Sequence, residues 1–92
     1  MKSEQAESIA TQALIWLAQD EDLVGVFLSS SGLAAEDLRK QAQDAEFLGF
    51  VLDFILMADE HVIGFSGANG LPPETVLQAR MALPGGDHPN WT

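Results

Sequence analysis

The segment over residues 45–58 constrains the fold more than any other part of the sequence, because it is almost entirely apolar. Within its last twelve residues the only charged side chain is Asp53. That length favours a helix over a buried strand, and a helix that is apolar nearly all round lies in a core or an interface. The sequence therefore predicts a central helix over 45–58. Its Asp53 either marks the one solvated edge or pairs with Arg80 or Lys40.

Shorter helices are predicted on both sides of this segment, from apolar spacings of three and four and from capping residues. They run over 4–18, 20–28, 35–43, 59–69 and 72–83. Ser3 and Asp44 are the expected N-caps of the first and fourth helices. Gly32 is expected to end the second helix with a positive φ. The predicted fold class is all-α, with five to six short helices.

The two halves of the chain resemble each other at an offset of 38 residues, and six of 34 positions are identical between 9–42 and 47–80. The matches fall at turns and core positions, for example Gly32 with Gly70. This internal repeat predicts two similar three-helix units with pseudo-two-fold symmetry and a fourth helix that is the most buried. Two helical turns built by the same capping rules would give the same similarity.

The net charge of the chain limits the classes of molecule that it is expected to bind. Its 92 residues include 14 acidic and only 4 basic side chains, so the net charge is −10. Nucleic acids are bound through clustered Lys and Arg, and here only Arg39 and Lys40 are adjacent. The balance disfavours a nucleic acid and suits a basic protein partner, although solubility alone also explains such a charge.

Few residues of the sequence suggest a catalytic or metal-binding site. There is no cysteine, and His61 and His88 lack the spacing of metal ligands, so both are expected to be solvated. Asp53 stands without a nucleophile and base beside it. We therefore expect no enzyme, no cofactor and no metal.

The length of the chain fits a single domain, predicted over residues 1–86 with a C-terminal tail over 87–92. No stretch reaches the roughly 18 apolar residues of a membrane span. No secretory signal follows the polar N-terminus. The expected location is the cytoplasm, without membrane association.

The leading functional hypothesis is a protein–protein interaction or adaptor module, present as a monomer or a weak homodimer. The expected contacts are Trp91, Phe50 and Met57. Tryptophan is enriched among binding anchors, so Trp91 either folds back onto its own domain or docks into a partner.

The alternative hypothesis is a DNA-associated regulator that uses a helix-turn-helix-like hairpin. Leu28, Gly32 and Leu38 have the spacing of such a hairpin, and Arg39 and Lys40 would contact the nucleic acid. However, Glu36 and Asp37 lie at the start of the hairpin's second helix, over 35–43, where their negative charges would be repelled by the phosphates of the nucleic acid.

Four segments of the sequence resemble a family of small bacterial helical proteins, a domain of unknown function. They lie at 44–48, 51–56, 70–74 and 83–86, and the resemblance extends over nearly the whole chain. It implies a short, stand-alone, intracellular helical protein. It carries over no catalytic or binding residue, because the shared positions are caps, turns and core.

Overall fold

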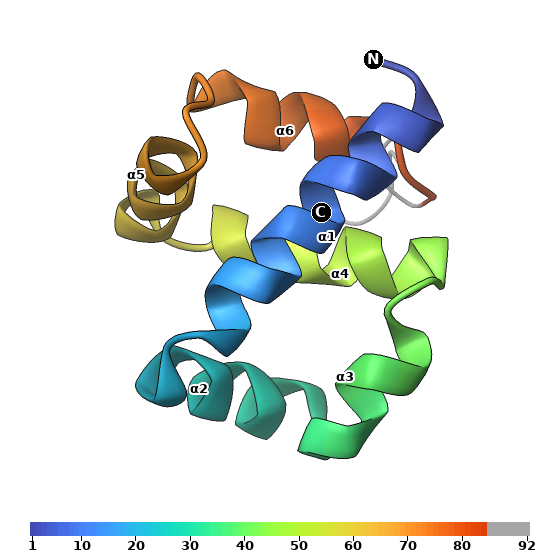
Figure 1. Cartoon of the computed structure of the whole chain (residues 1–92), viewed down its shortest axis with the longest axis vertical. Helices are drawn as coiled ribbons and strands as arrows, with labels where there is room; N and C mark the ends of the chain where they lie inside the picture. The colour runs from blue at the N-terminus through green and yellow to red at the C-terminus, as the bar shows by residue number, and fades with distance from the viewer. Residues whose placement is uncertain (85–92) are drawn as a thin grey trace.

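The computed structural model of the protein describes residues 1–84, which form six α-helices and, within that range, no strand (Figure 1). The helices are α1 (Ser3–Ala18), α2 (Glu21–Ser31), α3 (Ala35–Gln41), α4 (Ala45–Leu56), α5 (Asp59–Ala68) and α6 (Glu74–Met81). The all-α prediction is confirmed.

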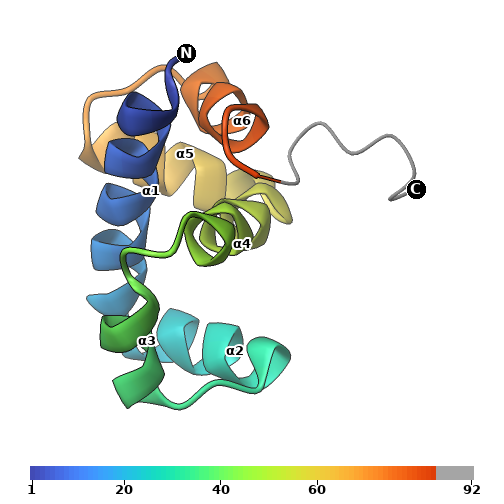
Figure 2. The ribbon, with the colours of Figure 1, turned by 90° about the vertical axis from the view of Figure 1, so that its right-hand side faces the viewer.

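The core is built around α1 and α4, which pack against each other; they cross in Figure 1, and Figure 2 shows α1 along one side of the molecule with α4 near the middle. The sixth helix packs on both of them, while α5 packs on α4 and α2 on α1. Seven of the twelve residues of α4 are buried, against six of sixteen in α1. The prediction that the fourth helix is the most buried is therefore confirmed.

Phe27 anchors α2 to the core, because it is the only buried residue of that helix. Its ring centroid lies 5.2 Å from that of Phe54, 5.5 Å from that of Phe50 and 6.2 Å from that of Phe47. Edge-to-face and tilted pairs at these separations are favourable. A single phenylalanine thus holds the second helix to three aromatic residues of α4.

The predicted stop and start residues are largely confirmed. Gly32 and Gly70 take φ values of +74° and +65°, which a residue with a side chain rarely adopts. The Oδ1 atom of Asp44 accepts a hydrogen bond from the backbone N–H of Glu46 at 3.1 Å. The prediction for Ser3 is wrong: α1 begins at Ser3 itself, and Lys2 occupies the N-cap position without a side-chain hydrogen bond.

The second helix runs three residues further than predicted, to Ser31. The hydroxyl groups of Ser30 and Ser31 donate to the carbonyls of Phe27 and Leu28 at 3.1 and 3.3 Å. Serine in a helix is tolerated when it bonds to the preceding turn in this way. The serine run therefore extends the helix, and Gly32 ends it.

The pseudo-two-fold symmetry is not confirmed, because the third helices of the two halves differ. No residue of α3 is buried, whereas α6 buries Val76 and Ala79 and packs on both central helices. At the repeat offset, the half-buried Gln41 of α3 stands where α6 has Ala79. The larger polar side chain does not suit a tight helix contact. The internal repeat itself stays a prediction.

Candidate interaction surface

One line of residues on α4 and its C-cap residue Met57 reaches solvent. Glu46, Phe50, Asp53 and Met57 follow one another at intervals of four, three and four, which places them on one face of a helix. Phe50 is 38% and Met57 78% exposed, and Glu46 is exposed as well, while the remaining residues of α4 are buried or half-buried. We call these four residues the α4 stripe. It contains both predicted contact residues that the structure describes.

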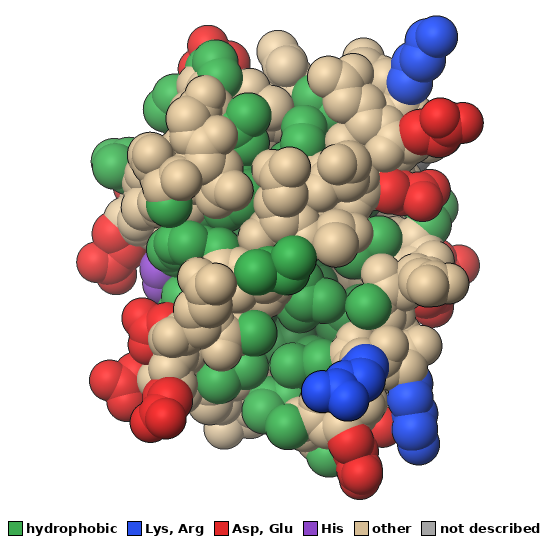
Figure 3. All heavy atoms as spheres, viewed as in Figure 1, with side chains coloured by type: hydrophobic (Ala, Val, Ile, Leu, Met, Phe, Trp, Pro, Cys, Tyr) green, Lys and Arg blue, Asp and Glu red, His purple; other side chains and the backbone are tan. Residues whose placement is uncertain are grey.

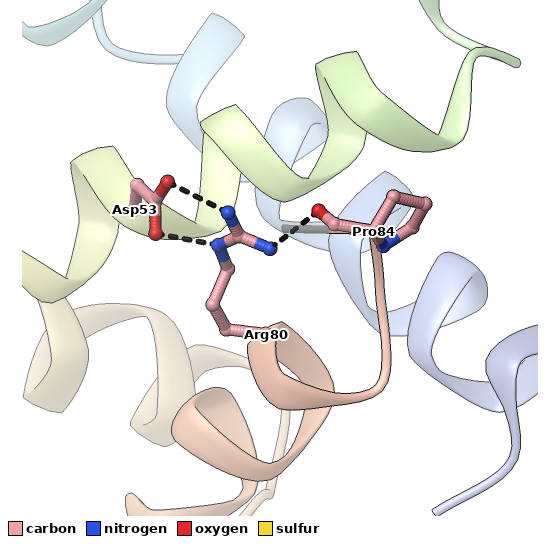
Figure 4. Close-up of polar contacts among 3 residues, drawn as sticks. All are labelled: Asp53, Arg80 and Pro84. Carbon is pink, nitrogen blue, oxygen red and sulfur yellow. Dashed lines mark hydrogen bonds and ion pairs between the residues drawn. The ribbon is translucent and has the colours of Figure 1, made fainter. Parts of the chain in front are cut away.

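Asp53, in the middle of the stripe, is paired with Arg80 of α6 (Figure 4). The Nε atom of Arg80 donates to Oδ1 at 2.5 Å, and Nη2 donates to Oδ2 at 3.1 Å. The Arg80 side chain is 13% exposed and that of Asp53 39%. A two-pronged contact of this kind fixes geometry as well as adding energy. Of the alternatives that the sequence left open for Asp53, the structure shows the pairing with Arg80 and not with Lys40.

Arg80 also holds the chain beyond α6. Its Nη1 atom donates to the carbonyl of Pro84 at 3.0 Å (Figure 4). The guanidinium group therefore ties the body of α4 to the residues that follow α6.

Gly49 makes room for this arrangement, and sequence reasoning missed it. A Cβ atom at this position would lie 2.9 Å from Nη1 and 3.2 Å from Cζ of Arg80, and 3.4 Å from the Pro84 oxygen. A glycine inside an otherwise strongly helical segment costs about 1 kcal/mol relative to alanine. That local disadvantage was the signal that something approaches Gly49 closely.

Residues 3–86 match the protein family described as "Protein of unknown function (DUF3572)". The chain belongs to this family. No curated protein and no solved structure matches the chain. The matched region covers all six helices of this DUF3572 protein and includes Gly49, Asp53 and Arg80.

The surroundings of the α4 stripe are acidic. Glu46 is its first residue and Asp44 lies two residues before it, while Asp59 and Glu60 come two and three residues after Met57; all four are exposed. The sequence has no Lys or Arg between Lys40 and Arg80. Because Arg80 is bound to Asp53, the stripe of this DUF3572 protein combines exposed apolar side chains with uncompensated negative charge.

Arg39 and Lys40 are not part of the stripe; they lie in the last turn of α3. Both are exposed, and with Ala35 and Glu36 they line a shallow depression on that helix. Figure 3 shows Lys and Arg side chains over α3, beside apolar side chains that gather on this face between α4 and the helices α2 and α3. Glu36 and Asp37 occupy the first turn of α3, so the two basic residues stand at the end of the helix that carries the negative pole of its dipole.

His61 is half-buried, and the expectation of a solvated histidine is wrong. Its ring stacks on Phe54, with centroids 5.4 Å apart, and its Nδ1 atom is buried without a hydrogen-bond partner. The packing of α5 on α4 places this side chain against the core. His88 and Trp91 lie outside the described residues.

Within residues 1–84, no three His, Asp or Glu side chains are grouped to hold a metal ion. None of the helices there has the length and apolar character that crossing a bilayer requires.

Proposed function

We propose that this protein functions by binding another protein through the α4 stripe. The observation that carries the proposal is the exposure of Phe50 and Met57 on the most apolar helix of the fold. Aromatic residues and methionine are enriched at protein interfaces. The other sides of α4 are covered by the rest of the fold. Within residues 1–84, no further element covers the face that carries Phe50 and Met57.

The occupant we propose is a different protein and not a second copy of this chain. A symmetric dimer would bring the same surface of two molecules together. Glu46, Asp59 and Glu60 of each copy would then approach the same carboxylates of the other. With a net charge of −10 on each chain, repulsion opposes that contact. A partner of opposite charge meets no such penalty.

The proposed activity is binding without catalysis. Asp53 is the carboxylate within the apolar run of α4, and both of its oxygens accept hydrogen bonds from Arg80. A general base needs a free oxygen within reach of the proton that it removes. In this arrangement the carboxylate joins α4 to α6.

A photo-crosslinking amino acid at position 57 tests the proposal in native lysate. We expect a discrete adduct heavier than the chain by the mass of a different protein, and its loss on Phe50→Ser. The matched control carries the crosslinker at position 26, because Val26 is also exposed, at 57%, but lies on α2. An adduct of twice the chain's mass, the same adduct from both positions, or no adduct from position 57 would overturn the proposal.

A further inference from the structure

The apolar and acidic side chains of the α4 stripe indicate what kind of segment the partner presents to it. We infer that the partner presents a cationic amphipathic helix to this stripe, an inference that rests on the proposed function. Three features of the described residues carry it: the spacing of the apolar anchors, the position of the acidic residues around them, and the absence of Lys and Arg from the stripe itself.

The two apolar anchors have the spacing of helix recognition. Phe50 and Met57 are seven residues apart, which is two helical turns or roughly 10 Å along the axis. A partner helix that lies along α4 presents apolar side chains at the same interval, at positions i and i+7. Anchors at this spacing on a helix face suit another helix better than an extended strand, whose side chains on one face repeat about every 7 Å.

The anchors differ in stiffness. Phe50 is held by the buried Phe27, with ring centroids 5.5 Å apart. Met57 is 78% exposed, and methionine adapts its shape to different apolar partners. The stripe thus combines one positioned aromatic side chain with one adaptable side chain, and both present apolar area to a helix laid across them.

Carboxylates stand at both ends of the apolar pair. Glu46 precedes Phe50 by one turn, so their Cβ atoms lie about 5–6 Å apart. Asp59 and Glu60 come two and three residues after Met57, and both are exposed. A partner helix with Lys or Arg on either side of its apolar face would meet a negative charge at each end. An anionic helix of the same shape would meet repulsion.

No basic residue on the stripe competes for these carboxylates. The sequence has neither Lys nor Arg from residue 41 to residue 79. Arg80 donates to Asp53 and to the Pro84 carbonyl, so its charge is committed within the fold. The electrostatic complement of the stripe therefore has to come from the partner.

A synthetic 18-residue helix of Leu and Lys, amphipathic by design, tests the inference against the full chain. A peptide with Gln in place of every Lys is its control. Backbone amide chemical shifts are followed by NMR during titration. We expect the Leu/Lys peptide to shift residues of α4 and the first turn of α5, with affinity that falls as salt is added. The Leu/Gln peptide should bind at least roughly tenfold more weakly.

Variants separate site-specific binding from general attraction to an acidic protein. We expect Met57→Ser, at a position exposed enough to leave the fold intact, to weaken binding roughly tenfold. Glu46→Gln with Glu60→Gln should weaken it roughly three- to tenfold. The matched controls on α2 are Val26→Ser, which removes another exposed apolar side chain, and the pair Glu21→Gln with Asp22→Asn, which removes the same charge. These should leave binding unchanged.

The outcomes distinguish this inference from the proposed function. Equal losses in the α2 controls, or shifts spread over all acidic surfaces, would overturn the cationic helix as the ligand. A position-57 adduct without binding of the Leu/Lys peptide would retain protein binding and reject the partner chemistry. Failure to obtain the position-57 adduct would overturn the proposed function and the inference together.

Discussion

Replacing Gly49 by alanine should destabilise this protein, although the same change stabilises most helices. Alanine in place of glycine in a helix interior gains about 0.8–1.0 kcal/mol. Here the new Cβ atom would lie 2.9 Å from Nη1 of Arg80. Ordinary carbon contacts begin near 3.5 Å, so the guanidinium group has to move by roughly 0.6 Å.

That movement disturbs three hydrogen bonds, two to Asp53 and one to the Pro84 carbonyl. A hydrogen bond to a charged group contributes about 1.5–3 kcal/mol. Asp53 is 39% exposed, which favours the lower end of that range because water screens the pair. Loss of one such bond, offset by the helix propensity of alanine, leaves a net destabilisation of about 1 kcal/mol.

Urea unfolding followed by far-ultraviolet circular dichroism measures this effect in a double-mutant cycle with Arg80→Met. In the Arg80→Met background the obstacle is absent, so Gly49→Ala should stabilise by about 0.8–1.0 kcal/mol. The coupling between the two sites should then be about 2 kcal/mol. Gly25→Ala is the matched control, since a Cβ atom there meets nothing within 4 Å. Equal stabilisation by Gly49→Ala in both backgrounds would refute the reasoning.

Three further changes probe the fold. Phe54→Ala, at a position 5% exposed, should lower the free energy of unfolding by about 3–5 kcal/mol; an unchanged melting temperature would show that the core is wrongly assigned. Asp44→Ala removes the side-chain cap of α4 and should cost about 1 kcal/mol in urea unfolding, a loss that Asp44→Ser should restore. Gly64→Leu places a side chain where a Cβ atom already lies 3.1 Å from Cζ2 of Trp16. In a Trp91→Phe background it should shift the emission of Trp16 to longer wavelength and cost about 1–3 kcal/mol, whereas unchanged emission would contradict the contact.

Local features were predictable where the sequence carries a local signal. The apolar run over 47–58 indicated the most buried helix, and Asp44 and Gly32 marked the ends of elements. The same reasoning failed at Ser3, because a serine before an apolar run fits either the cap or the first helical turn. Of the residues in the α4 stripe, only Phe50 and Met57 were predicted as contacts. The part played by their polar neighbours depends on how the helices pack.

What the sequence alone determined is therefore the set of helices and which of them is the most buried, because helical period and capping depend on residues within one or two turns. Tertiary structure alone decided that Arg80 and not Lys40 pairs with Asp53, across 27 residues of chain. It also decided that Gly49 lies beneath that guanidinium, and that α6 has buried residues while α3 has none. These outcomes depend on how rigid helices approach one another in space. No periodicity along a single helix encodes that approach.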